Sequence, residues 1–86
     1  MKLSEFVKNY RKMKLLTQTD LAEIMEISKM IISKIERGMP VSYKTLRTLS
    51  KVMGVDSELV YQMSEEDKEG LRWVWIVIII TRMGNN

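Results

Sequence analysis

The sequence predicts an all-α protein, and three observations support this fold class. Apolar residues recur at three- and four-residue spacing from Phe6 to Met53, which is the repeat of helices that bury one side. Serine or threonine precedes each apolar stretch and glycine follows two of them, as is typical of helix ends. The alternation of polar and apolar residues that marks β-strands is missing through residue 63. At 86 residues the chain can bury one small core.

The first helix is expected to begin at Ser4, whose hydroxyl can cap its N-terminus. Its core-facing stripe consists of Phe6, Val7, Tyr10, Met13 and either Leu15 or Leu16. Its other side carries Lys8, Arg11 and Lys12. This helix therefore has one apolar and one basic side.

The second and third helices are expected to follow each other closely. Thr17 to Asp20 has the Thr-x-x-Asp spacing of a capping box, and the stripe of the second helix is Leu21, Ile24 and Met25. Ser28 opens the third helix and Gly38 ends it in a left-handed conformation. The inward residues of the third helix are Ile35 and either Ile31 or Ile32.

A fourth helix is expected to begin at Ser42, because Pro40 cannot continue the third, and to end at Gly54. Its stripe is Leu46, Leu49, Val52 and Met53. A short further turn or helix is expected at about residues 56–62.

Only Glu26 and Ile27 separate Met25 from Ser28, so the second and third helices must turn sharply against each other. We expect them to pack through Leu21, Ala22, Met25, Ile27, Ile32 and Ile35. The small side chain of Ala22 permits close approach where the two helices cross. This is the geometry of a helix-turn-helix, which holds one short helix so that it fits a major groove about 12 Å wide.

The charge distribution favours a polyanionic partner. Residues 1–55 hold eleven Lys and Arg against five acidic residues, whereas residues 56–86 hold three against six. A basic half of this kind suits nucleic acid. The chain has no histidine or cysteine, no glycine-rich phosphate loop and no nucleophile paired with a base, so we expect no enzyme, no catalytic residue, no metal and no cofactor. The charged N-terminal residues do not read as a secretory signal, and a cytoplasmic location is expected.

Two stretches, "LTQTDLAEIMEISKMIISKIERG" and "SYKTLRTLSKVMGV", resemble the Cro/C1-type (XRE) family of helix-turn-helix regulators over residues 4–56. The matching positions are Thr17, Gln18, Leu21, Ala22, Ile27, Ser28, Ser33, Ile35 to Gly38, Leu46, Leu49 and Gly54. One departure is Glu26, because the family often has glycine at this turn position. A left-handed Glu26 would cost about 1 kcal/mol.

The resemblance implies a lambda-repressor-like domain of four to five helices that binds double-stranded DNA sequence-specifically, with the third helix (about 28–37) in the major groove. The implied function is a transcriptional regulator, and we expect a repressor. The alternative is an antitoxin, which binds a toxin and autoregulates its own operator.

Candidate base contacts lie on the exposed face of the third helix and are Lys29, Met30, Ser33 and Lys34. Lysine can donate to guanine O6 and N7, and methionine can pack on a thymine methyl group. Candidate contacts to the DNA backbone are Gln18, Thr17, Thr19, Ser28, Lys12, Ser42, Tyr43 and Lys44, several of which begin helices whose amides favour phosphate. Thr17 is also explained as a plain N-cap. In relatives, residues at the positions of Arg11 and Glu36 pair between the first and third helices, which implies a structural brace.

Residues 64–86 are expected to form a separate dimerisation segment after a DNA-binding domain of residues 1–63. Trp73 to Ile80 is an unbroken apolar run, and at eight residues it is well short of the roughly 20 that cross a membrane. A helix starting with a capping box at Ser64 is favoured, and the β-branched composition leaves a strand as the alternative. The expected dimer contacts are Leu71, Trp73, Val74, Trp75, Val77 and Ile78. A homodimer on a palindromic operator follows from the usual two-fold symmetry of such regulators.

Overall fold

Five helices make up residues 1–83, the part of the chain that the computed structural model describes; for residues 70–75 this description covers the backbone alone. They are α1 (Leu3–Met13), α2 (Gln18–Met25), α3 (Lys29–Glu36), α4 (Tyr43–Met53) and α5 (Ser57–Met83). No strand occurs within these residues. The all-α prediction is confirmed, and the choice left open for the C-terminal segment is helix as far as Met83.

The core lies where the apolar sides of the helices meet. Its most buried side chains are Val7, Leu21, Ile32, Ile35, Leu49 and Val60. Of the two candidates on α3, Ile32 is the buried one and Ile31 is half-buried. Each helix therefore contributes at least one fully buried residue, as the three- and four-residue spacing predicts.

Two residues assigned to the apolar stripes, Met13 and Ile24, are exposed instead, and of the alternatives Leu15 and Leu16 it is Leu16 that is half-buried. Met13 is 82% exposed, Leu15 is 90% exposed and Ile24 is 53% exposed. Met13 is the last residue of α1 and Leu15 lies in the turn after it with φ 57°, so neither continues the helical stripe. On α2, the side facing the core is occupied by Leu21, Ala22 and Met25, and Ile24 is left beside it.

Most of the predicted helix ends are present. Thr17 Oγ1 accepts a hydrogen bond from the Asp20 amide at 3.0 Å and Asp20 Oδ2 accepts one from the Thr17 amide at 2.9 Å, which completes the capping box. Ser42 Oγ accepts from the Thr45 amide at 3.2 Å. Gly38 and Gly54 both have positive φ, at 78° and 70°. These ends were predictable because each is formed by residues close in sequence.

The prediction for Ser4 is wrong. Helix α1 begins at Leu3, and its N-cap residue is Lys2, which makes no side-chain capping bond. Ser4 is buried inside the first turn, where its hydroxyl donates to Asp67 of α5 at 2.8 Å.

The prediction of a helix start at Ser64 is also wrong. Helix α5 is continuous from Ser57 to Met83 and joins the short element expected at residues 56–62 to the C-terminal segment. Ser64 is buried within this helix. Near the start of the helix, Asp56 Oδ1 accepts a hydrogen bond from the Glu58 amide at 3.0 Å. No glycine or proline stands between residues 57 and 69, so a helix that begins at Ser57 has no reason to stop at Met63.

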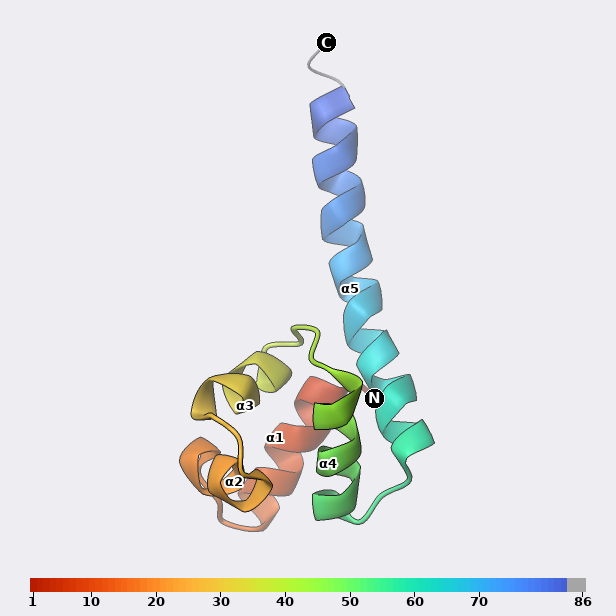
Figure 1. Ribbon diagram of the computed structural model, residues 1–86. Helices are drawn as coiled ribbons and strands as arrows, with labels where there is room; N and C mark the ends of the chain where they lie inside the picture. The colour runs from red at the N-terminus through yellow and green to blue at the C-terminus, as the bar shows by residue number, and fades with distance from the viewer. Residues whose placement is uncertain (84–86) are drawn as a thin grey trace.

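The helices α1 to α4 and the beginning of α5 pack together, and the rest of α5 projects away from them (Figure 1). The described chain is accordingly elongated, with extents of 51 × 24 × 22 Å. Within residues 1–83, no helix combines the length and the apolar character needed to cross a membrane.

Candidate nucleic-acid interface

The turn between α2 and α3 fixes how the two helices cross. Glu26 has φ 58° and ψ 42°, so it occupies the left-handed conformation that glycine adopts most easily. The Ile27 amide donates to the Ala22 carbonyl at 3.0 Å and closes the end of α2. Ala22 itself is buried, which allows the close approach that its small side chain predicts.

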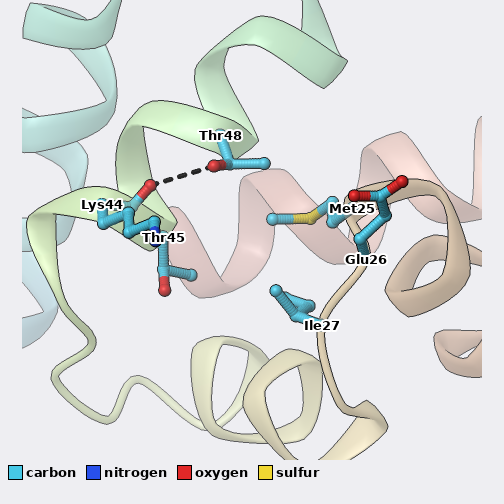
Figure 2. A pocket seen from close by; sticks show the side chains of 6 residues that line it. All are labelled: Met25, Glu26, Ile27, Lys44, Thr45 and Thr48. Atoms are coloured by element: carbon cyan, nitrogen blue, oxygen red, sulfur yellow. Dashed lines mark hydrogen bonds between the residues drawn. The ribbon is translucent and has the colours of Figure 1, made fainter.

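The turn also faces α4. Met25, Glu26 and Ile27 on one side and Lys44, Thr45 and Thr48 on the other line a surface cavity of about 420 Å³ (Figure 2). Thr48 Oγ1 donates to the Lys44 carbonyl at 3.0 Å, so the polar wall of this cavity is part of α4. No local sequence pattern predicts this cavity, because its two sides lie about twenty residues apart in the chain.

Helix α3 presents a polar and partly apolar face to solvent. Ile32 and Ile35 are buried, whereas Lys29 and Lys34 are exposed and Met30 is 65% exposed. Ser33 is half-buried, and its carbonyl accepts from Arg37 Nε at 3.3 Å. The four residues expected to contact bases therefore differ, with Lys29, Met30 and Lys34 open to solvent and Ser33 partly covered.

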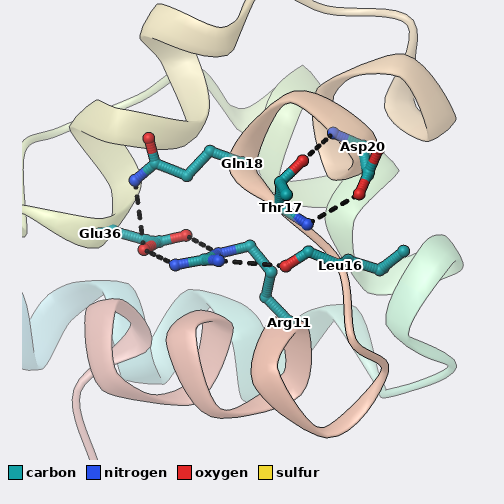
Figure 3. A network of polar contacts seen from close by, with 6 residues as sticks. All are labelled: Arg11, Leu16, Thr17, Gln18, Asp20 and Glu36. Atoms are coloured by element: carbon teal, nitrogen blue, oxygen red, sulfur yellow. Dashed lines mark hydrogen bonds and ion pairs between the residues drawn. The ribbon is translucent and has the colours of Figure 1, made fainter.

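A buried polar network fixes the other end of α3 (Figure 3). Arg11 Nε donates to Glu36 Oε2 at 2.8 Å and Arg11 Nη2 donates to Glu36 Oε1 at 3.0 Å, so the expected ion pair is present in a two-pronged form. The third donor, Arg11 Nη1, reaches the Leu16 carbonyl at 3.0 Å. Because Glu36 is only 5% exposed, its carboxylate depends on these protein donors for hydrogen bonds.

Gln18 is part of the same network, since its amide Nε2 donates to Glu36 Oε1 at 3.3 Å. The network therefore joins α1, the turn after it, α2 and α3. Hydrogen bonding to Glu36 raises the pKa of Arg11 above its ordinary value, so the guanidinium stays charged throughout the physiological range. The sequence suggested the Arg11 and Glu36 pair through resemblance alone, and nothing in it suggested the Leu16 carbonyl.

The start of α2 is already well satisfied by its own residues. The amide and the side chain of Thr17 are both hydrogen-bonded to Asp20. These hydrogen bonds lower the pKa of Asp20, and the one from the amide has the larger effect. Thr17 and Thr19 are exposed and Gln18 is half-buried. Thr17 is therefore the N-cap of α2, and its side chain is exposed to solvent.

The last turn of α3 lies near the start of α4. Lys34 and Ser42 line one surface cavity of about 250 Å³ together with Pro40 and Thr45. Lys44 and Tyr43 are exposed, and the Tyr43 ring packs edge-on against Tyr61 with centroids 5.4 Å apart. Ser28 is exposed and makes no side-chain capping bond.

Lys12 stands apart from these residues. It is exposed in the last turn of α1, and no described cavity or hydrogen bond joins its side chain to them. The structure thus brings Ser42 and Lys44 of α4 close to α3 and the turn before it, whereas Lys12 lines neither of these cavities.

The apolar end of α5 is open to solvent wherever its side chains are described. Val77 is 59% exposed and Ile78 is 38% exposed, and Ile76, Ile79, Ile80 and Met83 are exposed as well. The side chains of Leu71, Trp73, Val74 and Trp75, also expected at the dimer contact, lie outside the described set.

Among the described residues, no cluster of carboxylates that could hold a metal ion is present.

Comparison with known protein families identifies the family to which this helix-turn-helix belongs. Residues 7–60 match the family model HTH_3, whose description is helix-turn-helix. Neither the curated proteins nor the solved structures yielded a match. The matched range contains the turn at Glu26, the whole of α3, the Arg11 to Glu36 network and α4. Because it covers more than half of the 86 residues, the chain belongs to the Cro/C1-type (XRE) helix-turn-helix family, a family of DNA-binding transcription regulators.

Proposed function

We propose that this protein is a transcriptional repressor that binds a palindromic operator as a homodimer, with α3 of each subunit in a major groove. The observation that carries the proposal is the exposed face of α3, where Lys29, Met30 and Lys34 lie outside a buried apolar side. A helix held in this way can enter a groove without losing its packing to the domain.

Base reading is assigned to this face. Lys29 and Lys34 donate to guanine O6 and N7 or to nearby phosphates, and Met30 packs against a thymine methyl group. Ser33 contributes a hydroxyl where its partial burial allows. An exposed methionine between two lysines has little to gain from solvent, and contact with a base offers it an apolar partner.

Phosphate contacts are assigned to the helix starts around α3. The first group is Thr17, Gln18, Thr19 and Ser28, and the second is Ser42, Tyr43 and Lys44. Helix N-termini favour anions because their first amides lack helical partners and their dipoles are positive there. Lys12, which lies apart, adds attraction to the duplex without regard to sequence.

The Arg11 and Glu36 pair is assigned the role of a brace. Its donors connect α1 and α2 to the last turn of α3, so removing either charge leaves the other one poorly compensated. The brace acts on DNA binding through the orientation of α3.

The homodimer is proposed from the apolar end of α5. A monomer that left Ile76 to Ile80 exposed would present an apolar patch of the kind that marks protein contacts. A second copy of α5 can cover it and also bring two copies of α3 to paired half-sites. Leu71, Trp73, Val74, Trp75, Val77 and Ile78 are the residues assigned to this contact.

An antitoxin is the second candidate, and the same exposed end of α5 favours it, because a toxin could cover this helix in place of a second copy. The two functions differ in what the purified protein does alone. A repressor of the proposed kind sediments as a dimer without any other protein, whereas an antitoxin acquires its stable complex only when a toxin is added.

Selection of bound duplexes from a random pool tests the proposal. We expect enrichment of one sequence with two-fold symmetry, because two copies of α3 related by a dimer axis read the same half-site twice. Enrichment of unrelated sequences, or of none, would contradict sequence-specific binding. Enrichment of a single asymmetric half-site would retain the function of α3 and contradict the dimer.

A further inference from the structure

Asp67 of α5 reaches across to the start of α1. Its Oδ2 accepts a hydrogen bond from the Ser4 amide at 3.0 Å, and its Oδ1 accepts one from the Ser4 hydroxyl at 2.8 Å. Ser4 is 9% exposed, so both bonds are largely shielded from water. These two residues are 63 positions apart in the chain, and their contact joins the first turn of α1 to α5.

This contact supplies a cap that α1 lacks. The first amides of a helix have no acceptor within the helix, and the N-cap residue Lys2 provides no side-chain acceptor. A carboxylate at the positive end of the helix dipole is favourable as well. Asp67 therefore performs for α1, from a distant helix, what Thr17 and Ser42 perform locally for α2 and α4.

The end of α3 adjoins the same carboxylate. Gly38 follows α3 with φ 78°, and a Cβ placed on it would lie 3.1 Å from Asp67 Oδ1. A side chain at this position would be strained by its φ and would also press on the carboxylate. Asp67 thus lies at a junction of α1, α5 and the backbone that leaves α3.

Asp67 also marks the place where α5 leaves the domain. Val60, Met63 and Ser64 are buried before it, and residues 76–83 are exposed after it. Among the described side chains of α5, it is the last one hydrogen-bonded to another helix. The neighbouring Glu66 pairs with the Met1 amino group at 2.8 Å, but both groups are 51% exposed and are screened by solvent.

We propose that Asp67 is a positioning residue that sets which half-site spacing the dimer accepts, by fixing the angle between α5 and the DNA-binding helices. This inference rests on the proposed homodimer. Met83 lies 16 residues beyond Asp67, which is about 24 Å along a helix. A rotation of about 10° at Asp67 would move that end by about 4 Å, comparable to the ~3.4 Å step between base pairs.

Spacing preference is the measurement that tests this role. The full-length chain and its variants Asp67→Ala and Ser4→Ala are titrated with duplexes that carry one selected half-site, or two at centre-to-centre distances stepped by single base pairs. Glu69→Ala is the matched control, because it removes an exposed carboxylate from the same helix. Sedimentation and thermal melting of each protein accompany the titrations.

We expect wild type and Glu69→Ala to prefer one spacing, and Asp67→Ala to reduce that preference by about 3- to 30-fold, the range that one hydrogen-bonded network carries. Affinity for a single half-site and the dimeric state should stay the same. Ser4→Ala should lose less preference, because the bond from the Ser4 amide to Asp67 remains. An equal loss of affinity for single and paired half-sites, in step with a lower melting temperature, would show a purely structural cap and overturn the proposal.

Retention of the wild-type spacing preference in Asp67→Ala would also overturn it. If Asp67→Ala fails to fold, the spacing preference of Ser4→Ala decides by the same criteria. A wild-type protein that is monomeric and has no spacing preference would contradict the proposed homodimer and this inference with it. The affinities for single half-sites would still test DNA binding by α3.

Discussion

The helix-turn-helix region and the far end of α5 differ in how far their side chains are buried and hydrogen-bonded. In the first region the apolar residues Val7, Leu21 and Ile32 are buried, and the buried carboxylate of Glu36 has three donors. At the far end of α5, the described side chains from Ile76 to Met83 are all exposed. The first region buries its own apolar residues, whereas the far end of α5 would gain stability if another surface covered it.

The boundary between the two regions falls inside α5. Val60 and Met63 belong to the core, and Asp67 still bonds α1. The sequence placed this boundary at residue 63, before Ser64 and Asp67. The contacts of these two residues show that α5 still packs against the other helices about one turn beyond Met63.

Truncation within α5 should have the largest effect on operator binding. A chain that ends at Glu69 keeps Val60, Met63 and Asp67, so we expect it to fold, to sediment as a monomer and to bind the paired operator about a hundredfold more weakly through loss of avidity. A chain that ends at Met63 lacks the Asp67 cap and should also melt at a lower temperature. Undiminished operator affinity of the shorter chains would contradict the division of roles between the two regions.

Loss of the brace should be the largest single-residue effect on the helix-turn-helix region. Glu36→Ala leaves Arg11 without its partner in a partly buried site, and we expect the free energy of unfolding to fall by about 3 kcal/mol in urea denaturation. DNA affinity should fall as well, because α3 loses its fixed orientation.

Glu23→Ala is the control for Glu36→Ala, since Glu23 is an exposed carboxylate of α2. Surface changes of this kind usually alter stability by less than about 0.5 kcal/mol. An equal response of Glu23→Ala and Glu36→Ala would show that the network of Glu36 adds nothing to the fold.

Substitution of two lysines on different parts of the same region should separate sequence-specific base contact from non-specific electrostatic attraction to DNA. Lys34→Ala should weaken binding to the selected site by about 1–3 kcal/mol and relax preference at one base position, because Lys34 lies on the exposed face of α3. Lys12→Ala should weaken all duplexes about equally. If both variants lowered affinity for selected and scrambled duplexes by one common factor, α3 would not be the reading element.

The smallest effect expected is a gain in stability at the turn. Glu26→Gly removes the strain of a left-handed glutamate and should raise the free energy of unfolding by about 1 kcal/mol. Glu26→Ala removes the same carboxylate without relieving φ, so it should bring no such gain. Leu15→Gly is a second test, since Leu15 also has positive φ and is 90% exposed.

The sequence predicted features that depend on neighbouring residues. The capping box at Thr17 and the glycines after α3 and α4 are each formed within a few residues. The burial of Met13 was predicted wrongly because α1 ends at this residue, and a periodic pattern does not reveal where a helix stops. Ser4 looked like an N-cap because serine before an apolar stretch usually is one.

The candidate site was less accessible to sequence reasoning than the fold. The exposed side of α3 follows from its buried side, and so could be predicted for Lys29, Met30 and Lys34. The contacts of Ser4 with Asp67 and of Arg11 with the Leu16 carbonyl depend on how helices meet, and no local signal announces them. Proximity of residues distant in sequence is a property of the packed chain.

Affinity for the selected duplex and for a scrambled duplex of equal length, measured across a range of salt concentrations, tests the central claim most directly. Sequence reading by α3 predicts a selected duplex that binds at least about a thousandfold more tightly at physiological salt. It also predicts a logarithmic salt dependence several units negative, at about 0.9 per phosphate contact. Equal affinity for the two duplexes at every salt concentration would contradict the claim that this protein reads DNA sequence.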